Sequence, residues 1–495
     1  MELSDEQAYA LELFKQGNNL LISGPGGTGK SKLIRDFVHY AKENDKKIQI
    51  TALTGCASLL LGLNAKTIHS WSGIRLCKGT NESIIEQACK NKNAKKNWKS
   101  VKILVIDEGS MMSRKMFDVL NAIAKKIRND PRPFGNIQVI VTCDFYQLPP
   151  VETTGDEESG EFCFESPHYN EVFPLENHIL LTKIFRQKDP QYIEILNEVR
   201  KGNLTKPTIE ILKQYVNREY NMEENNGIYL TKLFPTRSRV DNLNKQMFDA
   251  LDDSEKSFEL TKSTATLVYA ENGKAIEKEK IDLCRCLQQR DIDNEINQLI
   301  SSSPALETLS LKLNTMVMCN VNLDMERKIC NGSQGVIIDF VGSENAPKVR
   351  FSNNVTMIMT KHVWQSETYP TISISQYPLQ HAWALTIHKI QGTTLKVAQM
   401  DIGNSVFTYG QSYVALSRIE SLNGLYLSGF EPNKIKANPK VTAFYEKIPP
   451  MDNDKLQALI RENKTQNIFH DFELKEESYE TSTPINKDVK IIKLP

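Results

Sequence analysis

Apolar and polar positions follow two patterns along the chain, and each pattern predicts a different kind of fold. Over the first third, short apolar runs at 18–23, 46–51, 101–107 and 137–142 are separated by helical patterns, one of which covers 111–127. Strands that alternate with helices are typical of a parallel sheet covered by helices. The first third is therefore predicted to be an α/β domain.

The same α/β pattern returns later and is interrupted once. "GIYLTKLFPT" (227–236) precedes a helical pattern, and strand and helix patterns resume at 381–392 and 412–430. Between them, 309–365 holds short alternating runs broken by Asn-Gly and Ser-Asn-Asn turns. Such runs predict a small antiparallel barrel inserted into a second α/β half. After about Pro450 the chain turns polar, and we expect a tail with little fixed structure.

The composition is that of an ordinary globular protein and excludes few classes of function. The chain has 495 residues, of which 40% are hydrophobic and 25% charged, and this length suggests two to four domains. Lys+Arg 61 balances Asp+Glu 61, so any site for a polyanion must be local. The apolar runs are too short to cross a bilayer, and we expect no membrane partner.

Cysteine usage indicates the compartment. Nine cysteines, an odd number without paired spacing, follow a start that lacks an apolar leader segment. We therefore expect free thiols and an intracellular, reducing compartment, with nucleus, cytoplasm and a viral replication site left open. Cys284 and Cys286 are separated by one residue and have no nearby His partner, so we expect no metal there.

A phosphate-binding loop is the strongest single motif. "GPGGTGKS" (24–31) fits the pattern G-x-x-x-x-G-K-[ST], and it lies between a predicted strand and a predicted helix. Its glycines let backbone N–H groups converge on phosphate oxygens, while Lys30 reaches the β and γ oxygens and Ser31 offers a hydroxyl to Mg²⁺. A glycine-rich turn that binds nothing is the alternative. The predicted nucleotide-binding residues are Gln7, whose amide suits an adenine edge, and Gly24, Pro25, Gly26, Gly27, Thr28, Gly29, Lys30 and Ser31.

Two carboxylates end the next apolar run. In "VKILVIDE" (101–108), Asp107 stands at the end of a predicted strand, where it can hold Mg²⁺. Glu108 beside it can orient or deprotonate an attacking water. An Asp-Glu pair at a strand end is also a common helix cap, so this assignment depends on the phosphate loop.

The run "IQVIVTCDFYQLPP" (137–150) places Asp144 and Gln147 just beyond another strand. In an open parallel sheet, ligands gather outside the carboxyl ends of the strands. We therefore expect both side chains to face the γ-phosphate edge of one crevice, with Gln147 sensing whether γ-phosphate is present. A turn capped by Asp and ended by Pro is the alternative.

In this order the motifs resemble the petite-integration-frequency group of superfamily 1B helicases, which is related to RecD and Dda. The stretch 107–151, from "DEGSMM" to "QLPPV", resembles that group's magnesium motif, its signature stretch and its "GDFFQLPPV" motif. The resemblance spans roughly 3–430. Further matches are "TALTGCASLLLGLNAKTIHSWSGI", "LTKIFRQKDPQYIEILNEVRKGN", "LTIHKIQGTTL" and "YVALSRIESLNGLYL".

The resemblance implies an α/β fold of two RecA-like P-loop domains, with ATP between them and single-stranded DNA across both. It also implies a small wedge inserted in the first domain and an SH3-like β-barrel inserted in the second. The expected limits are 1–185 for the first domain with its wedge at about 71–101, 186–250 and 376–450 for the second domain, 251–375 for the insertion with its barrel at about 309–365, and 451–495 for a flexible tail.

The resemblance assigns two further catalytic residues. Arg186 of "IFRQ" and Arg418 of "ALSR" would project from the second domain onto the γ-phosphate. Charge spread over transferring phosphoryl oxygens is best met by fixed guanidinium groups. A surface ion pair is the alternative for an isolated arginine, and only the position of each within a matched motif favours the catalytic role.

A path for single-stranded DNA is also implied. Hydroxyl, imidazole and ammonium groups suit phosphate contacts that fix position without reading sequence. By resemblance these are Thr54, His69 and Ser70 in the first domain and His388 and Lys389 in the second. Trp71 or Trp383 would suit base stacking, with core packing as the alternative for both.

A lysine run marks the first-domain insertion. "KNKNAKKNWKSVK" (90–102) carries six lysines and no acidic residue. In the family, the element that meets the fork stands at this place, so Lys95 and Lys96 are predicted to bind DNA. A lysine run is also the usual mark of a solvated face, and this alternative stays open.

The implied activity is ATP-dependent DNA unwinding in the 5′-to-3′ direction, with ATP and Mg²⁺ as cofactors and a role in replication, repair or recombination. We expect single-stranded and forked duplex DNA as partners and a monomer, with a dimer on DNA left open. A nucleotide-gated DNA-binding module with degenerate hydrolysis is one alternative. It is suggested only by Gly109, where the family has Ile or Val, and by Cys143, where it has Gly. The second alternative is a clamp-loader-type ATPase that acts on protein. Such an enzyme would need an arginine finger from a neighbouring subunit.

Overall fold

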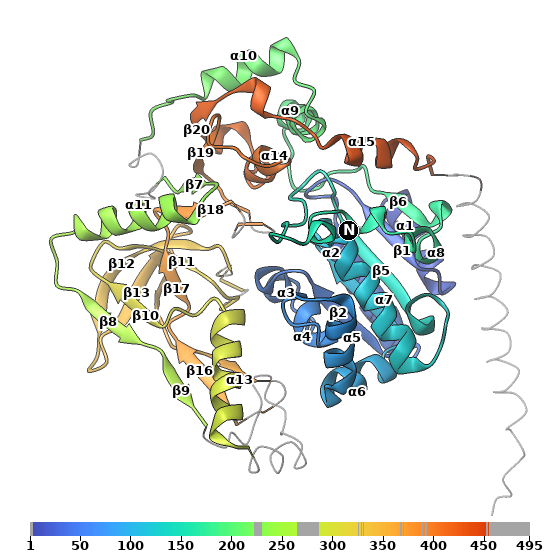
Figure 1. The fold of residues 1–495 in the computed structure, drawn as a ribbon. Coiled ribbons are helices and arrows are strands. Elements are labelled where there is room, and N and C mark those ends of the chain that lie inside the picture. The colour runs from blue at the N-terminus through green and yellow to red at the C-terminus, as the bar shows by residue number, and fades with distance from the viewer. Residues whose placement is uncertain are drawn as a thin grey trace, which may run out of the picture.

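Two parallel sheets covered by helices, and a third part built of antiparallel strands, make up the protein (Figure 1). In Figure 1 the first α/β unit lies to the right in blue and cyan, and the antiparallel part lies at the lower left. The computed structural model describes residues 3–221, 230–264, 287–324, 326–327, 329, 331–366, 369, 371–387, 390–391, 394–451 and 454.

The first sheet is parallel throughout and has the strand order β3-β2-β4-β5-β1-β6. Every residue of β1 and β4 is buried, which explains their unbroken apolar runs, because helices cover both faces of a parallel sheet. The predicted α/β fold is confirmed. The strands are β1 Leu20–Ser23, β2 Ile48–Ala52, β3 Lys66–Thr67, β4 Ile103–Asp107, β5 Gln138–Cys143 and β6 His178–Leu180.

Helices on the two faces of this sheet bury two separate apolar cores. Phe14 of α1 and Phe37 of α2 belong to one core, and their rings stack with centroids 4.2 Å apart. Phe117 of α7 belongs to the other core. The helices are α1 Asp5–Lys15, α2 Lys30–Glu43, α3 Gly55–Leu61, α4 Ile68–Ser72, α5 Asn81–Lys90, α6 Lys92–Ser100, α7 Arg114–Arg128 and α8 Tyr169–Val172.

The residues predicted to form the wedge, about 71–101, include α5 and α6, and both helices pack on α7. One stripe of α6 is apolar, and Trp98 on it is fully buried, with its indole N–H donating to the carbonyl of Ser72 at 3.1 Å. Its ring lies 4.6 Å from that of Trp71. Four lysines occupy the remaining, exposed side of α6. These are Lys92, Lys95, Lys96 and Lys99.

The second parallel sheet has the strand order β18-β7-β19-β20. Its core includes Tyr192 of α9, Leu233 of β7 and Leu425 of β20. The strands are β7 Lys232–Phe234, β18 Ala384–Thr386, β19 Ala398–Ile402 and β20 Leu425–Phe430. The helices are α9 Pro190–Lys201, α10 Lys206–Gln214, α11 Arg237–Asp249 and α14 Gln411–Leu416.

Antiparallel strands between β7 and β18 form three sheets around one shared core. The run 309–365 holds such strands, as its turns predicted, but strands from outside that run join them, so the SH3-like barrel and its limits stay a prediction. The helix of this part is α13 Gln289–Ser302. The strands are β8 Lys256–Glu259, β9 Thr261–Ser263, β10 Thr308–Leu311, β11 Met316–Cys319, β12 Gln334–Val341, β13 Ala346–Phe351, β14 Thr356–Ile358, β15 His362–Gln365, β16 Ser373–Gln376 and β17 Leu379–His381.

The last helix with clear bounds, α15 Pro439–Glu446, returns to the first unit (Figure 1). Val441, Phe444 and Ile448 are buried in the core that α7 covers. The predicted limits had put these residues in the second domain. Their spacing places them on one helical stripe, and burying that stripe against the first sheet fixes where α15 lies. None of the described helices is both long and apolar enough to span a membrane.

Candidate nucleotide and nucleic-acid site

The loop between β1 and α2 has the backbone that its glycines predict. Gly27 has φ 88°, and a side chain there would also meet Cβ of Arg186 at 2.6 Å, so only glycine fits. Lys30 donates to the carbonyls of Gly24 and Pro25 at 2.6 and 3.0 Å. Burial lowers the pKa of Lys30, although nearby carboxylates raise it. The loop therefore holds its lysine folded against the backbone that phosphate oxygens are predicted to approach.

Asp107 and Glu108 lie together at the end of β4, as predicted. Thr142 of β5 donates its hydroxyl to Asp107, and burial raises the pKa of both carboxyl groups. Glu108 has a left-handed backbone with φ 57°, a conformation that costs a side-chain residue about 1–2 kcal/mol. Strain of this kind gathers at functional sites.

The residues present suit Mg²⁺. Its preferred ligands are oxygen atoms, and it is usually held by one or two carboxylates together with substrate phosphates. Asp107 offers a carboxylate, and Ser31 offers an exposed hydroxyl in the first turn of α2. In the part of the chain that the structure describes, no three His, Cys, Asp or Glu side chains gather to hold a metal on their own.

Both predicted arginine fingers reach the phosphate loop from the second domain. A Cβ placed on Gly26 would lie 3.6 Å from Nη1 of Arg186 and 3.7 Å from Nη2 of Arg418. Arg418 is 2% exposed and is held by the carbonyl of Val414 and the hydroxyl of Ser417, at 3.0 and 2.8 Å. Burial and the charge of Arg186 lower the pKa of Arg418 to about 10. Two guanidinium groups at one glycine, that of Arg418 buried and that of Arg186 half-buried, leave positive charge that an anion would neutralise.

A glutamine that sequence reasoning did not single out joins the catalytic groups. Gln391 is 5% exposed, and its Nε2 donates to Oε2 of Glu108 at 3.1 Å and to Oε1 of Gln147 at 3.3 Å. Gln391 belongs to the second domain, whereas Glu108 and Gln147 belong to the first. Gln147 therefore lies in the crevice beside Glu108, as predicted. The signal for Gln391 was its place in the matched stretch "LTIHKIQGTTL".

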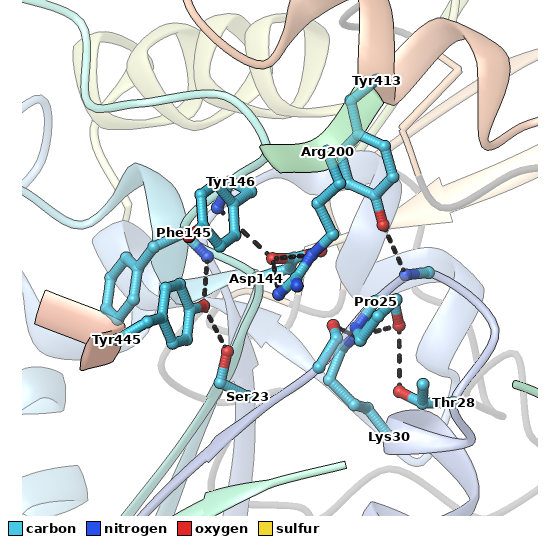
Figure 2. A network of polar contacts seen from close by, with 12 residues as sticks. Ser23, Pro25, Thr28, Lys30, Asp144, Phe145, Tyr146, Arg200, Tyr413 and Tyr445 are labelled. Atoms are coloured by element: carbon cyan, nitrogen blue, oxygen red, sulfur yellow. Dashed lines mark hydrogen bonds and ion pairs between the residues drawn. The ribbon is translucent and has the colours of Figure 1, made fainter. Parts of the chain in front are cut away.

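Asp144 is bound by Arg200 of α9 (Figure 2), and its charge also acts on Lys30 of the phosphate loop, so its predicted place at the γ-phosphate edge stays a prediction. Nε of Arg200 lies 3.1 Å from each carboxylate oxygen, and Nη2 lies 2.8 Å from Oδ1. The guanidinium also lies over the ring of Tyr146, with Cζ 4.5 Å from the centroid. A fully buried carboxylate needs a paired cation, and Arg200 meets that need from the other domain.

Tyr445 of α15 ties the same loop to β1 (Figure 2). Its hydroxyl accepts from the N–H of Phe145 at 3.0 Å and lies 2.5 Å from Oγ of Ser23. Its ring stacks on Tyr146 with the centroids 4.9 Å apart. Because Ser23 is the last residue of β1, α15 braces the strand end that leads into the phosphate loop.

Gln7 lies against the phosphate loop, with both ends of its amide engaged. Oε1 accepts from the backbone N–H of Ser4 in a capping box at the start of α1. Nε2 donates to the carbonyl of Thr28 at 3.0 Å. Gln7 therefore supports the loop in this structure, and its predicted contact with adenine stays a prediction.

The two departures from the family pattern lie against each other. A Cβ on Gly109 would lie 3.5 Å from Cβ of Cys143 and 2.4 Å from Cγ1 of Val141. The resembled family has Ile or Val at position 109 and Gly at position 143. This chain has the smaller residue at position 109 and the larger one at position 143. Val141 occupies the space that a side chain at Gly109 would need, and Cys143 is fully buried beside it. Neither departure removes a group with a predicted catalytic role.

A cleft of about 600 Å³ separates the first domain from α13 and β15. Ser70, predicted to bind DNA, lines it together with Lys92 and Trp364. Thr54 caps α3 by accepting from the N–H of Ala57 at 3.1 Å. Burial lowers the pKa of His69, the neighbour of Ser70.

The remaining nucleic-acid predictions have different outcomes. Lys95 and Lys96 are exposed, which both interpretations of the lysine run require. Trp71 is 2% and Trp383 is 4% exposed, so core packing holds for both. His388 and Lys389 lie outside the described residues.

Comparison with known proteins points to one family. Residues 2–210 match a family model described as "PIF1-like helicase". "ATP-dependent DNA helicase PIF1" of Danio rerio is 34% identical over 450 residues, which are 90% of this chain but 64% of that relative, less than two thirds of its length. "ATP-dependent DNA helicase Pif1" of Bdellovibrio bacteriovorus is 31% identical over 90% of this chain and 92% of that relative. The crystal structure of Pif1 helicase from Candida albicans has a TM-score of 0.71 and 31% identity, and the match covers 91% of this chain and 100% of that one.

Proposed function

Because the chain belongs to the PIF1-like helicase family, we propose that it uses ATP hydrolysis to move 5′ to 3′ along single-stranded DNA and to unwind duplex. One observation carries the proposal: Arg186 and Arg418 of one domain reach the phosphate loop of the other within a single chain. Single-stranded and forked DNA are the proposed partners, and a monomer is the proposed working unit. A reducing compartment is also proposed, and the free thiols of Cys77, Cys89, Cys143, Cys163 and Cys319 support it.

Each group at the crevice has a role in phosphoryl transfer to water. Lys30 leaves the carbonyls that it contacts and binds the β and γ oxygens, while Arg186 and Arg418 meet charge that develops on the γ-phosphoryl group. Glu108 holds the attacking water, and the raised pKa of its carboxyl group suits it to accept a proton. Asp107 and Ser31 would hold Mg²⁺, which neutralises charge on the phosphate oxygens.

Coupling between hydrolysis and DNA follows from contacts that cross between the domains. Gln391 touches Glu108 and Gln147 at once, so a shift of the second domain changes the surroundings of the water-holding carboxylate. Asp144, three residues before Gln147, is fixed to Arg200 of α9. The loop after β5 therefore connects the γ-phosphate edge to two segments of the second domain.

The two alternative classes fit less well. A module with degenerate hydrolysis was suggested only by Gly109 and Cys143, and neither departure removes a group with a predicted catalytic role. An ATPase of the clamp-loader type completes its site with a neighbouring subunit, whereas here both arginines come from the same chain.

Strand separation on tailed duplexes tests the proposed function. The protein is expected to hydrolyse ATP faster when single-stranded DNA is added and to unwind a duplex that carries a 5′ tail. A duplex with a 3′ tail of the same sequence and a blunt duplex serve as matched substrates. Unwinding of the 3′-tailed duplex alone would contradict the proposed direction, and turnover that DNA does not stimulate would contradict the helicase assignment.

The lysines of α6 provide a second prediction. Changing Lys92, Lys95, Lys96 and Lys99 together to Glu is expected to weaken unwinding of a 5′-tailed fork and to flatten the salt dependence of DNA binding. Each phosphate that the variant no longer neutralises should lower the slope by about 0.9 log units per log of salt on duplex, or about 0.7 on a single strand. ATP hydrolysis without DNA should persist, because these exposed side chains lie outside the nucleotide crevice.

The control variant makes the same change of charge elsewhere. Lys42, Lys201, Lys206 and Lys213 are also exposed, and none belongs to the predicted wedge. This variant should retain normal unwinding and a normal salt slope. If the α6 variant unwinds 5′-tailed forks as well as this control at physiological salt, the lysine run is only a solvated face.

A further inference from the structure

The phosphate loop receives a third side chain from the second domain besides the two arginines. Tyr413 lies in α14, and its hydroxyl accepts a hydrogen bond from the N–H of Gly26 at 3.0 Å (Figure 2). Tyr413 is 2% exposed. Arg418 lies two residues after the last residue of α14, Leu416, so one short segment brings both side chains to the phosphate loop.

The hydroxyl proton of Tyr413 is still available for donation. Among the residues that the structure describes, no acceptor for this proton lies within hydrogen-bonding distance. Burial raises the pKa of Tyr413, so the hydroxyl stays protonated at physiological pH. Buried donors are normally paired in folded proteins, and an unpaired one points to a missing acceptor.

The surroundings of this proton suit an anion. Arg186 and Arg418 both lie within 4 Å of the position that a Cβ on Gly26 would occupy. The helix end of such a loop cradles the α- and β-phosphates, and the lysine reaches the β and γ oxygens. A group that covers Gly26 from the opposite domain therefore faces the terminal phosphate.

We propose that the Tyr413 hydroxyl donates a hydrogen bond to the γ-phosphate of ATP while it still accepts from Gly26, and that this contact lets the enzyme distinguish ATP from ADP. The proposal rests on the proposed function, since it concerns the same nucleotide. ADP lacks the γ-phosphate and gains nothing from the hydroxyl.

Nucleotide affinity of a Tyr413→Phe variant tests this contact. The change removes one oxygen and keeps the buried ring. A hydrogen bond to a charged group is typically worth enough to lower affinity roughly 10-fold or more when it is removed. The affinity for a non-hydrolysable ATP analogue with Mg²⁺ is therefore expected to fall at least about 10-fold, while the affinity for ADP with Mg²⁺ stays within about 2-fold of wild type.

Tyr192→Phe is the matched control. Tyr192 is also fully buried, and its hydroxyl donates to the carbonyl of Leu416 at the end of α14, away from Gly26. This variant should lower the melting temperature but leave the ratio of the two affinities unchanged. If Tyr413→Phe weakens both nucleotides equally, or weakens neither, the hydroxyl only supports the loop and the proposal is overturned.

Failure of this contact can be distinguished from failure of the proposed function. DNA-stimulated hydrolysis and unwinding are measured on the wild-type chain, whereas the Tyr413 contact is measured as an affinity ratio without DNA. A wild-type chain that unwinds DNA beside a Tyr413→Phe variant with an unchanged ratio would overturn the contact alone. A wild-type chain that binds neither nucleotide would overturn both.

Discussion

A chain carrying Lys30→Ala is expected to lose all measurable ATP hydrolysis, with or without DNA. Lys30 is the only cation of the phosphate loop 24–31, and its ammonium lies 2.6 Å from the carbonyl of Gly24, within the loop itself. Without it, the charge on the β and γ oxygens is not met from the first domain. Steady-state phosphate release with saturating single-stranded DNA measures the effect.

Glu108→Gln separates binding from chemistry in the same assay. The amide keeps the size of the side chain but cannot take a proton from water, so the variant should bind ATP and stall before hydrolysis. Nucleotide binding to Glu108→Gln should therefore stay near wild type while turnover is lost. Turnover of Lys30→Ala near the wild-type rate would contradict the assignment of the phosphate loop.

Arg418→Ala is expected to produce the second largest effect, a loss of roughly 10³- to 10⁵-fold in DNA-stimulated turnover. The guanidinium is held in place by the carbonyl of Val414 and the hydroxyl of Ser417, and it lies beside Arg186 at Gly26. Its charge matters most when charge spreads over the transferring phosphoryl oxygens. ATP affinity should therefore change much less than the rate of the chemical step, which single-turnover hydrolysis reports.

Arg418→Lys is the informative comparison for this variant. Lysine keeps the charge but lacks the rigid fork that donates to several oxygens, so it should restore only a small part of the rate. Equal melting temperatures of the two variants would exclude unfolding as the cause. If Arg418→Ala keeps more than about a tenth of the wild-type turnover, the residue supports α14 and is not a finger.

The parts of the site that are local in sequence were predictable. The phosphate loop, the carboxylate pair at the end of β4 and the position of Gln147 each depend on a short segment and on the strand before it. Parallel strands place their carboxyl ends at one edge of the sheet, so separate motifs could be assigned to one crevice without a structure. The order of the elements in both α/β units followed from hydrophobic periodicity for the same reason.

The contacts that were missed join segments far apart in the chain. Arg200 and Asp144 are separated by 56 residues, and the hydroxyl of Tyr445 reaches Phe145 across 300 residues. No local pattern indicates such a pair, because either side chain alone looks like a surface arginine or a buried aromatic residue. Burial explains the pairing of Asp144 with Arg200, because a carboxylate removed from water needs a cation beside it, and that cation can come from any part of the chain. The limits of the second domain failed at α15 for a related reason.

The position of α15 has a consequence for how the protein is made. A ribosome completes the strands and helices of the first domain long before it adds Val441, Phe444 and Ile448, which fill part of that domain's core. Each of these side chains contributes about 1.5–3 kcal/mol when buried, out of a net stability of roughly 5–15 kcal/mol for a typical domain. While the second domain is translated, the core of the nascent first domain therefore lacks these three apolar side chains. Only chains extended through Ile448 can fill that gap, so the two domains complete their folding in one late step. Interrupted translation leaves a fragment with exposed apolar surface, which chaperones and proteases of the cell would bind.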